Sequence, residues 1–218
     1  MNANPIAGAK PRGRPRNRTV RRNILETTLR LLKSETVKSI SIEGIAKASG
    51  VSKATIYRWW NSKGAIVIDA FIEQHIVRTP MRRDIPPGEA LAEHMRALIE
   101  QYSGLGGRIV AQIVAEAQFD PTLAQELRER FLYGRQAVVR EIVEEWRRSG
   151  GIDPSVNVEV LMDALYAPIY MRLLLGHAPL NADFARDLPA SIFSWLGAAR
   201  SDAARAPNES PGPLPRQR

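Results

Sequence analysis

A short segment of the chain, SKATIYRWWNSK, combines the side-chain types that a protein needs to read DNA. After Ser52 come Lys53, Ala54 and Thr55, which are small or cationic. A lysine ammonium can donate to guanine acceptors, and alanine or threonine methyl groups can touch thymine methyl groups. Tyr57 adds a phenol for a base or a phosphate, and Arg58 can contact either. The segment therefore predicts a recognition helix whose first residues enter a major groove.

The two adjacent tryptophans of this segment should point in different directions. Ile56 and Trp60 are four residues apart, so they share a helix face and should pack against the preceding helices. Trp59 is offset from Trp60 by about 100° and falls nearer the DNA face, where its indole N–H could donate to a phosphate. Lys63 opens the next helix, where a cation and free backbone N–H groups both favour phosphate. We predict an apolar anchor behind the recognition surface and a cationic rim beside it.

Three short helices are predicted to position these side chains. The first begins near Thr19, and Ser41 and Ser52 are N-caps of the second and third. Gly50 breaks the helical pattern between them, so the segment has the form of a helix-turn-helix. We include both capping serines among the candidate DNA contacts. A helical hairpin with an exposed basic face is the alternative, but the two caps, the glycine turn and the charge distribution coincide here.

The positive charge of the chain is concentrated at its N-terminal end. Residues 1–63 hold 14 lysines and arginines against 3 acids, whereas residues 64–218 hold 17 against 20. A basic module joined to a mildly acidic body indicates a polyanion-binding protein. The alternative is a basic tail that only aids solubility, but the contrast continues past the tail into the helical region.

Composition and motifs argue against other classes of protein. Cysteine is absent and no run of about 18 apolar residues occurs, so we expect neither disulfides nor a membrane span. We expect a cytoplasmic, nucleoid-associated location. His75, His94 and His177 are scattered, so no metal site or cofactor is expected. No nucleophile elbow or phosphate loop of the usual form occurs, which leaves a small enzyme tethered to nucleic acid as a weak alternative.

The N-terminal run PRGRPRN has the form of an extended minor-groove arm. Proline and glycine would keep it extended, while Arg12 and Arg14 enter a narrow, A·T-rich groove. A disordered leader that adds only non-specific charge is an equal alternative.

The stretch SIEGIAKASGVSKATIYRWWNSKGAIVIDAF resembles the TetR/AcrR family of transcriptional repressors over about residues 20–75. The matching positions are Ile45, Ala46, Gly50, Val51, Ser52, Tyr57, Trp60, Ser62 and Lys63. The resemblance implies an all-α homodimer with a three-helix, helix-turn-helix DNA-binding domain and a helical C-terminal domain for ligand binding and dimerisation. Two positions depart from the pattern: Trp60 replaces the usual phenylalanine, and Gly64 stands where a side chain is usual.

We therefore expect four regions in the chain. These are a disordered basic arm over 1–18, the DNA-binding domain over 19–65, the ligand-binding and dimerisation domain over 66–204, and a disordered tail over 205–218. Further helices, the first capped by Ser62, are predicted over residues 63–77, 88–102, 107–118, 121–148, 156–175 and 182–199.

The resemblance also implies a small-molecule pocket in the C-terminal domain. Tyr102, Arg108, Tyr166 and Tyr170 carry polar groups that could orient an unknown ligand, although core packing is the competing interpretation. The run LMDALYAPIYMRLLLGHAPLNADFARDL resembles one C-terminal class in which the last two helices pair with their copies. The apolar positions expected in that homodimer interface are Leu161, Leu165, Ile169, Leu173, Leu174, Ile192, Phe193, Trp195 and Leu196.

Together these expectations describe a sequence-specific repressor of transcription. Two recognition helices would read a palindromic operator with half-sites about 34–36 Å apart, and a ligand would release the protein by moving the helix over 63–77. The alternative is a transcriptional activator or architectural DNA binder that needs no ligand.

Overall fold

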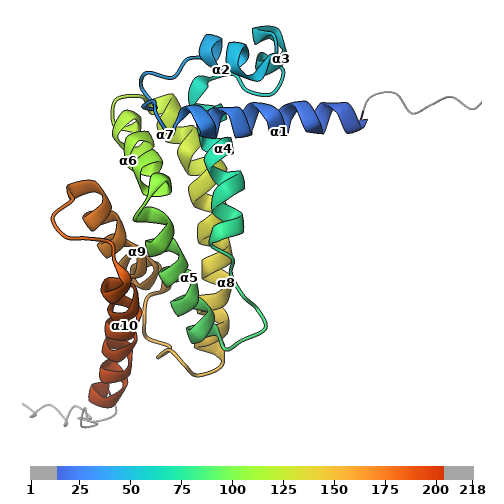
Figure 1. The fold of residues 1–218 in the computed structure, drawn as a ribbon. Helices are drawn as coiled ribbons and strands as arrows, with labels where there is room; N and C mark the ends of the chain where they lie inside the picture. The colour runs from blue at the N-terminus through green and yellow to red at the C-terminus, as the bar shows by residue number, and fades with distance from the viewer. Residues whose placement is uncertain (1–13, 204–218) are drawn as a thin grey trace, which may run out of the picture. The chain divides into compact units, whose positions relative to one another are not determined.

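The computed structural model describes residues 14–203, apart from the side chains of residues 14–17, 77 and 197–203, and this part of the chain is helical without a β-strand (Figure 1). The predicted all-α class is confirmed. The helices are α1 (Arg14–Leu31), α2 (Ile42–Ser49), α3 (Lys53–Tyr57), α4 (Lys63–Arg78), α5 (Pro87–Tyr102), α6 (Leu105–Ala117), α7 (Pro121–Leu127), the π-helical η1 (Arg128–Leu132), α8 (Tyr133–Arg148), α9 (Val158–Leu175) and α10 (Ala182–Ala203). No helix within the described range is both long and apolar enough to cross a membrane.

The predicted helix starts are confirmed where a capping side chain marks them. Ser41, Ser52 and Ser62 accept from the backbone N–H of the third residue that follows, and Asp120 accepts from the N–H of Thr122 and Leu123. Each such cap is worth about 1 kcal/mol, because it satisfies an amide that has no partner inside the helix. These caps fix the starts of α2, α3, α4 and α7.

Several helix ends differ from the expected ones by up to four residues, as in α6, α9 and α10, and two differences are larger. Helix α1 begins at Arg14 rather than Thr19. Pro15 is compatible with this start, because backbone N–H groups in the first helical turn have no partner inside the helix and a proline there loses no hydrogen bond. The expected arm therefore loses its last residues to α1, and residues 1–13 lie outside the described residues. The helix expected over 121–148 is divided by η1, whose wider turn accommodates an extra residue between α7 and α8.

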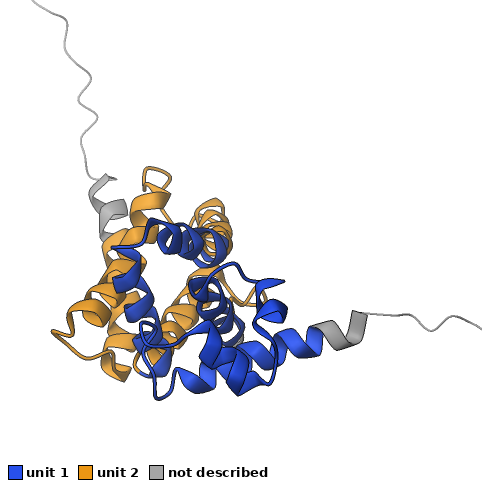
Figure 2. Ribbon diagram, turned by 90° about the horizontal axis from the view of Figure 1, so that it is seen from above, with its two compact units in different colours: residues 1–79, 104–135 blue, residues 80–103, 136–218 orange. Residues whose placement is uncertain are grey.

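The chain packs as two compact units, which Figure 2 distinguishes by colour. Among the described residues, unit 1 contains 14–79 and 104–135, and unit 2 contains 80–103 and 136–203. Unit 1 thus holds α1–α4 together with α6, α7 and η1, so the three N-terminal helices do not pack alone. The functional boundary expected near residue 65 stays a prediction.

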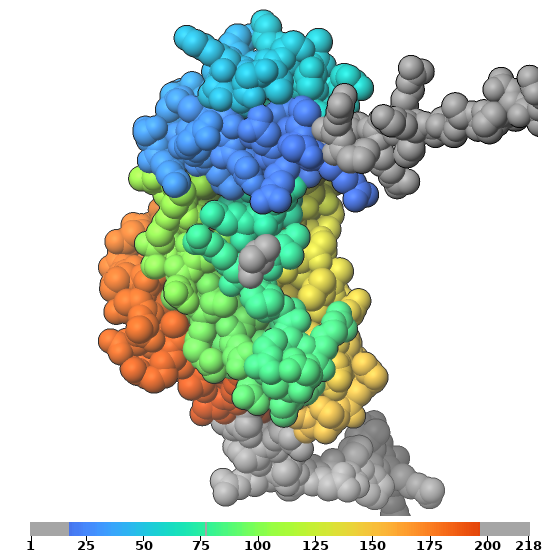
Figure 3. Space-filling model, turned by 45° about the vertical axis from the view of Figure 1, so that its right-hand side comes forward, coloured from blue at the N-terminus to red at the C-terminus, as the bar shows by residue number. Residues whose placement is uncertain are grey.

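Each unit has its own apolar core. In unit 1, Ile24, Ile45, Ile56 and Phe71 are buried together with Trp60. Figure 3 shows α1, in dark blue, packed directly against the lighter blue α2–α3 segment, in keeping with the contacts between α1 and α2. In unit 2, the buried residues include Leu91, Met95, Val143, Leu165 and Ile169.

Candidate nucleic-acid interface

The turn between α2 and α3 depends on a glycine backbone. Gly50 has φ 70°, in the left-handed region that other residues avoid. Its N–H and that of Val51 both donate to the carbonyl of Ala46, which closes the end of α2. A Cβ atom at Gly50 would meet nothing within 4 Å, so its backbone conformation alone requires glycine.

Helix α3 presents one exposed face and one buried face. Lys53, Ala54, Tyr57 and Arg58 are exposed, and 54% of Tyr57 is accessible. Thr55 is half-buried, and its hydroxyl lies 2.9 Å from that of Ser52. The structure thus brings most of the predicted base-contacting residues to one surface, which runs along the whole of this short capped helix.

An acidic residue that the sequence did not single out faces the recognition surface. Glu43, in the first turn of α2, accepts from the ammonium of Lys53 at 2.9 Å. The hydrogen bond and the charge of the ammonium lower the pKa of Glu43, and the same contact raises the pKa of Lys53. The ammonium expected to contact guanine is therefore held by a carboxylate when no DNA is bound. The two residues are ten positions apart in the sequence and lie on different helices, so helical spacing does not predict their contact.

The predicted apolar anchor is present behind α3. Ile56 is 0% exposed and Trp60 is 1% exposed. Trp59 is half-buried and meets Trp60 edge to face, with ring centroids 5.6 Å apart. The two tryptophans thus separate as their angular offset predicts.

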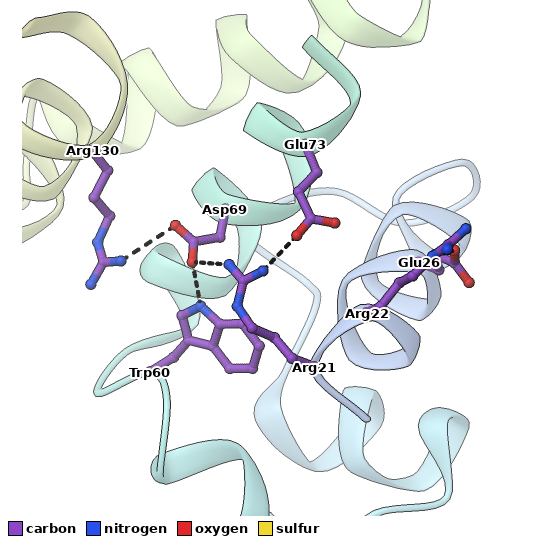
Figure 4. A network of polar contacts seen from close by, with 7 residues as sticks. All are labelled: Arg21, Arg22, Glu26, Trp60, Asp69, Glu73 and Arg130. Atoms are coloured by element: carbon purple, nitrogen blue, oxygen red, sulfur yellow. Dashed lines mark hydrogen bonds and ion pairs between the residues drawn. The ribbon is translucent and has the colours of Figure 1, made fainter. Parts of the chain in front are cut away.

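The anchor is held in place by Asp69 of α4, which sequence reasoning missed (Figure 4). Its Oδ2 accepts from the indole Nε1–H of Trp60 at 2.8 Å and from the guanidinium of Arg21 at 3.0 Å. Its Oδ1 accepts from Arg130 of η1 at 3.3 Å. Arg21 also pairs with Glu73, one turn further along α4. One carboxylate thereby connects α1, the segment between α3 and α4, α4 itself and η1.

The remaining predicted DNA contacts are placed as follows. Lys63 donates to the backbone carbonyl of Lys38 at 3.0 Å, so its ammonium lies at the loop before α2. Ser41 and Ser52 serve as caps. Arg12 lies outside the described residues, and Arg14 is the first residue of α1, with a side chain that is not described.

The four predicted ligand residues divide between the two units. Tyr102 of α5 and Tyr170 of α9 lie in unit 2, with hydroxyl oxygens 3.3 Å apart, and Tyr166 lies one turn before Tyr170. Arg108 belongs to unit 1, where its guanidinium donates to the carbonyl of Lys33 at 3.1 Å. The described residues contain no group of three or more side chains arranged to hold a metal ion.

The expected dimer interface needs a correction. Leu161, Leu165, Ile169 and Ile192 are each at most 4% exposed, so they form the core of unit 2 rather than its surface. Helix α9 carries apolar residues around much of its circumference, so spacing alone could not separate core from surface. Among the described side chains of α9 and α10, the large apolar ones that are exposed are Val160, Met171, Leu174, Leu175 and Trp195.

Comparisons with known proteins agree with this arrangement. Residues 24–70 match the model for bacterial regulatory proteins of the tetR family, and residues 88–192 match that of the tetracyclin repressor-like C-terminal domain. The HTH-type transcriptional regulator YdeS of Bacillus subtilis is 29% identical over 187 residues, which cover 86% of this chain and 94% of YdeS. The crystal structure of the TetR-family regulator SCO0332 matches with a TM-score of 0.71 and 31% identity, over 80% of this chain and 97% of that one.

A more distant structure shares the fold. FadR from Bacillus subtilis, solved in complex with stearoyl-CoA, matches with a TM-score of 0.65 and 19% identity, over 79% of this chain and 97% of that one. The N-terminal family model, the related regulator and the solved structures agree with the helix-turn-helix geometry of α2 and α3. This chain belongs to the TetR family of transcriptional regulators, and its N-terminal helices are the DNA-binding domain of that family.

Proposed function

We propose that the protein is a homodimeric transcriptional repressor that reads a palindromic operator with two copies of α3. The observation that carries the proposal is the two-sided character of α3. Lys53, Tyr57 and Arg58 are exposed, while Ile56 is fully buried on the opposite face. A helix anchored in this way can enter a groove without losing its support.

The proposal includes release by a small molecule bound in the helical C-terminal domain. FadR, which shares this fold, was solved with stearoyl-CoA, so response to a ligand is compatible with the architecture. A ligand can release DNA only if it binds better to a conformation that binds DNA less well. Helix α4 is the element we expect to respond, since its Asp69 holds Trp60 directly behind the recognition surface.

Exposed apolar side chains support the proposed dimer. Met171, Leu174 and Leu175 of α9 and Trp195 of α10 are each at least 45% exposed. Exposed apolar residues gathered on neighbouring elements commonly mark a protein interface. We propose that these residues, rather than the buried leucines of α9, meet their copies in the dimer.

Footprinting and affinity measurements on the DNA upstream of the protein's own gene test the DNA-binding part. We expect symmetric protection with half-sites about one helical turn apart. Tyr57→Ala should weaken binding to the operator more than to random duplex. Lys63→Ala should weaken both equally and reduce the salt slope by about one, because it removes a phosphate contact.

An exposed cation of unit 2 provides the control. Arg186 of α10 pairs with Asp183 and Asp187, so Arg186→Ala should leave DNA binding unchanged. Equal binding of the wild-type protein to operator and random duplex would contradict the proposal. If the promoter becomes more active when the protein is bound, the protein is an activator. A ligand-independent activator is the alternative function.

A further inference from the structure

Aromatic and polar side chains of α5 and α9 face one another inside unit 2. The rings of His94 and Tyr166 have centroids 6.2 Å apart, and those of Tyr102 and Tyr170 have centroids 5.8 Å apart. Both pairs meet edge to face. Two turns of α5 thus contribute to one aromatic layer against α9.

Gln101 of α5 is buried without satisfying its amide. The residue is 6% exposed, and neither its amide nitrogen nor its amide oxygen has a hydrogen-bond partner within the described residues. A buried group that lacks a partner costs about 1–3 kcal/mol, so such residues are rare unless they have a role. The amide therefore offers one acceptor and two donors to a molecule that could reach it.

The position of Gln101 along α5 places it on the same side as the aromatic layer. It follows His94 by seven residues, and a helix returns to nearly the same face after seven residues, with a drift of about 20°. It also directly precedes Tyr102, whose hydroxyl meets that of Tyr170. The amide thus belongs to the face of α5 that carries the two aromatic contacts.

This part of unit 2 lacks a buried fixed charge. His94 and Gln101 are the buried polar side chains in its described residues, and no carboxylate, lysine or arginine there is buried. Burial raises the pKa of the Tyr170 phenol, so this group stays a neutral hydrogen-bonding group near pH 7. An ionised ligand would lose its hydration here without gaining a carboxylate or guanidinium partner, which is costly.

We propose that Gln101 recognises an uncharged aromatic ligand that carries both a hydrogen-bond donor and an acceptor, bound between α5 and α9. The amide of Gln101 pairs with the polar group of the ligand, and the rings of His94, Tyr102, Tyr166 and Tyr170 supply aromatic contacts. This inference rests on the proposed function, because it specifies the chemical class of the molecule that releases the DNA.

Two probes of equal size test the charge preference. 4-Hydroxybenzamide is neutral with a donor and an acceptor, and 4-hydroxybenzoate is its anionic counterpart near pH 7. Calorimetric titration of the full chain at millimolar probe should show binding of the benzamide and at least tenfold weaker binding of the benzoate. No binding of the benzamide, or equal binding of both probes, would overturn the inference.

The variant Gln101→Leu tests the residue itself. It removes the unsatisfied amide at similar volume, so the Tm of the free protein should rise while binding of 4-hydroxybenzamide falls at least tenfold. A lower Tm would mean that the amide has a structural partner, and unchanged benzamide binding would mean that it does not meet the ligand. Either result would overturn the assignment.

A matched variant and a separate DNA assay complete the test. Gln118 is an exposed glutamine at the end of α6, so Gln118→Leu should change neither the Tm nor the binding of the benzamide by a comparable amount. Gel-shift assays on the operator fragment should show that Gln101→Leu still binds DNA. Failure of the wild-type protein to bind DNA would contradict the proposed function, whereas the calorimetric results concern Gln101 alone.

Discussion

Asp69 shows how a single residue can stabilise a recognition surface that it does not belong to. Its carboxylate is 17% exposed and accepts hydrogen bonds from Trp60, Arg21 and Arg130. The indole contact is the most enclosed of the three, since Trp60 is buried and both arginine side chains are more than 30% exposed. Partly exposed ion pairs contribute little to the free energy of unfolding. The hydrogen bond to the indole should therefore be the largest of the three contributions that Asp69 makes to it.

Two substitutions of Asp69 separate these contributions. Asp69→Ala leaves the Trp60 N–H without its acceptor and should lower the free energy of unfolding by about 1–3 kcal/mol. Asp69→Asn keeps an acceptor oxygen but loses the charge, so it should cost less, about 1 kcal/mol or below. Urea denaturation measures both, with Glu73→Gln as a control for loss of one ion pair to Arg21. Equal losses for the two variants would show that charge, rather than the indole bond, holds the anchor.

At the scale of elements, α7 packs closely on the first turn of α4. A Cβ atom at Gly64 would lie 2.5 Å from Cδ1 of Leu123, and the capping hydroxyl of Ser62 donates to the buried carboxylate of Glu126 at 2.8 Å. Gly64 departs from the family pattern, and this close approach supplies a physical reason for it. The glycine accommodates a neighbouring helix, whatever its cost to the helix propensity of α4.

A double-mutant cycle tests this contact between elements. Gly64→Ala gains at most about 1 kcal/mol of helix propensity in either background, but only when Leu123 is present does the new methyl group approach a side chain atom more closely than an ordinary contact. Gly64→Ala should therefore be more favourable in a Leu123→Ala background than in the wild-type protein, by about 1 kcal/mol or more. The free energy of unfolding of the four proteins gives this coupling. A coupling near zero would mean that the Leu123 side chain or α7 moves aside at no cost.

For the whole molecule, the apolar residues of α9 and α10 divide into two groups with different roles. Leu165 and Ile169 are fully buried inside unit 2, whereas Leu175 and Trp195 are each more than 65% exposed. The first group stabilises the folded chain, and the second is free to meet another copy. Substitutions in the two groups should therefore have different consequences.

Sedimentation measurements distinguish these consequences. Trp195→Glu should shift the protein from dimer to monomer at micromolar concentration, because it places a charge in an apolar interface. Leu165→Ala should instead lower the free energy of unfolding by about 2–5 kcal/mol through the cavity it leaves. Phe119 of unit 1 is 92% exposed, so Phe119→Glu is a matched control that should leave the dimer intact. A wild-type protein that sediments as a monomer would contradict the proposed dimer.

Much of the fold follows from short-range patterns in the sequence. Serine caps at 41, 52 and 62 and the glycine at position 50 predicted the helix-turn-helix, because capping bonds and the left-handed backbone involve residues at most five positions apart. The spacing of Ile56 and Trp60 predicted the buried anchor for the same reason. The predicted DNA-contacting and ligand-binding roles of individual residues stay predictions.

The sequence by itself determined the helical class, the starts of α2, α3, α4 and α7, and the two faces of α3, since each depends on neighbours along one helix. Only the tertiary structure decided which partners those helices meet. Packing pairs Lys53 with Glu43 and brings Asp69 to Trp60 and Arg130, all from different turns or helices. Packing also decides that Leu165 is buried. Helical periodicity fixes the direction of a side chain but not the element that lies opposite it, so these contacts are set by packing.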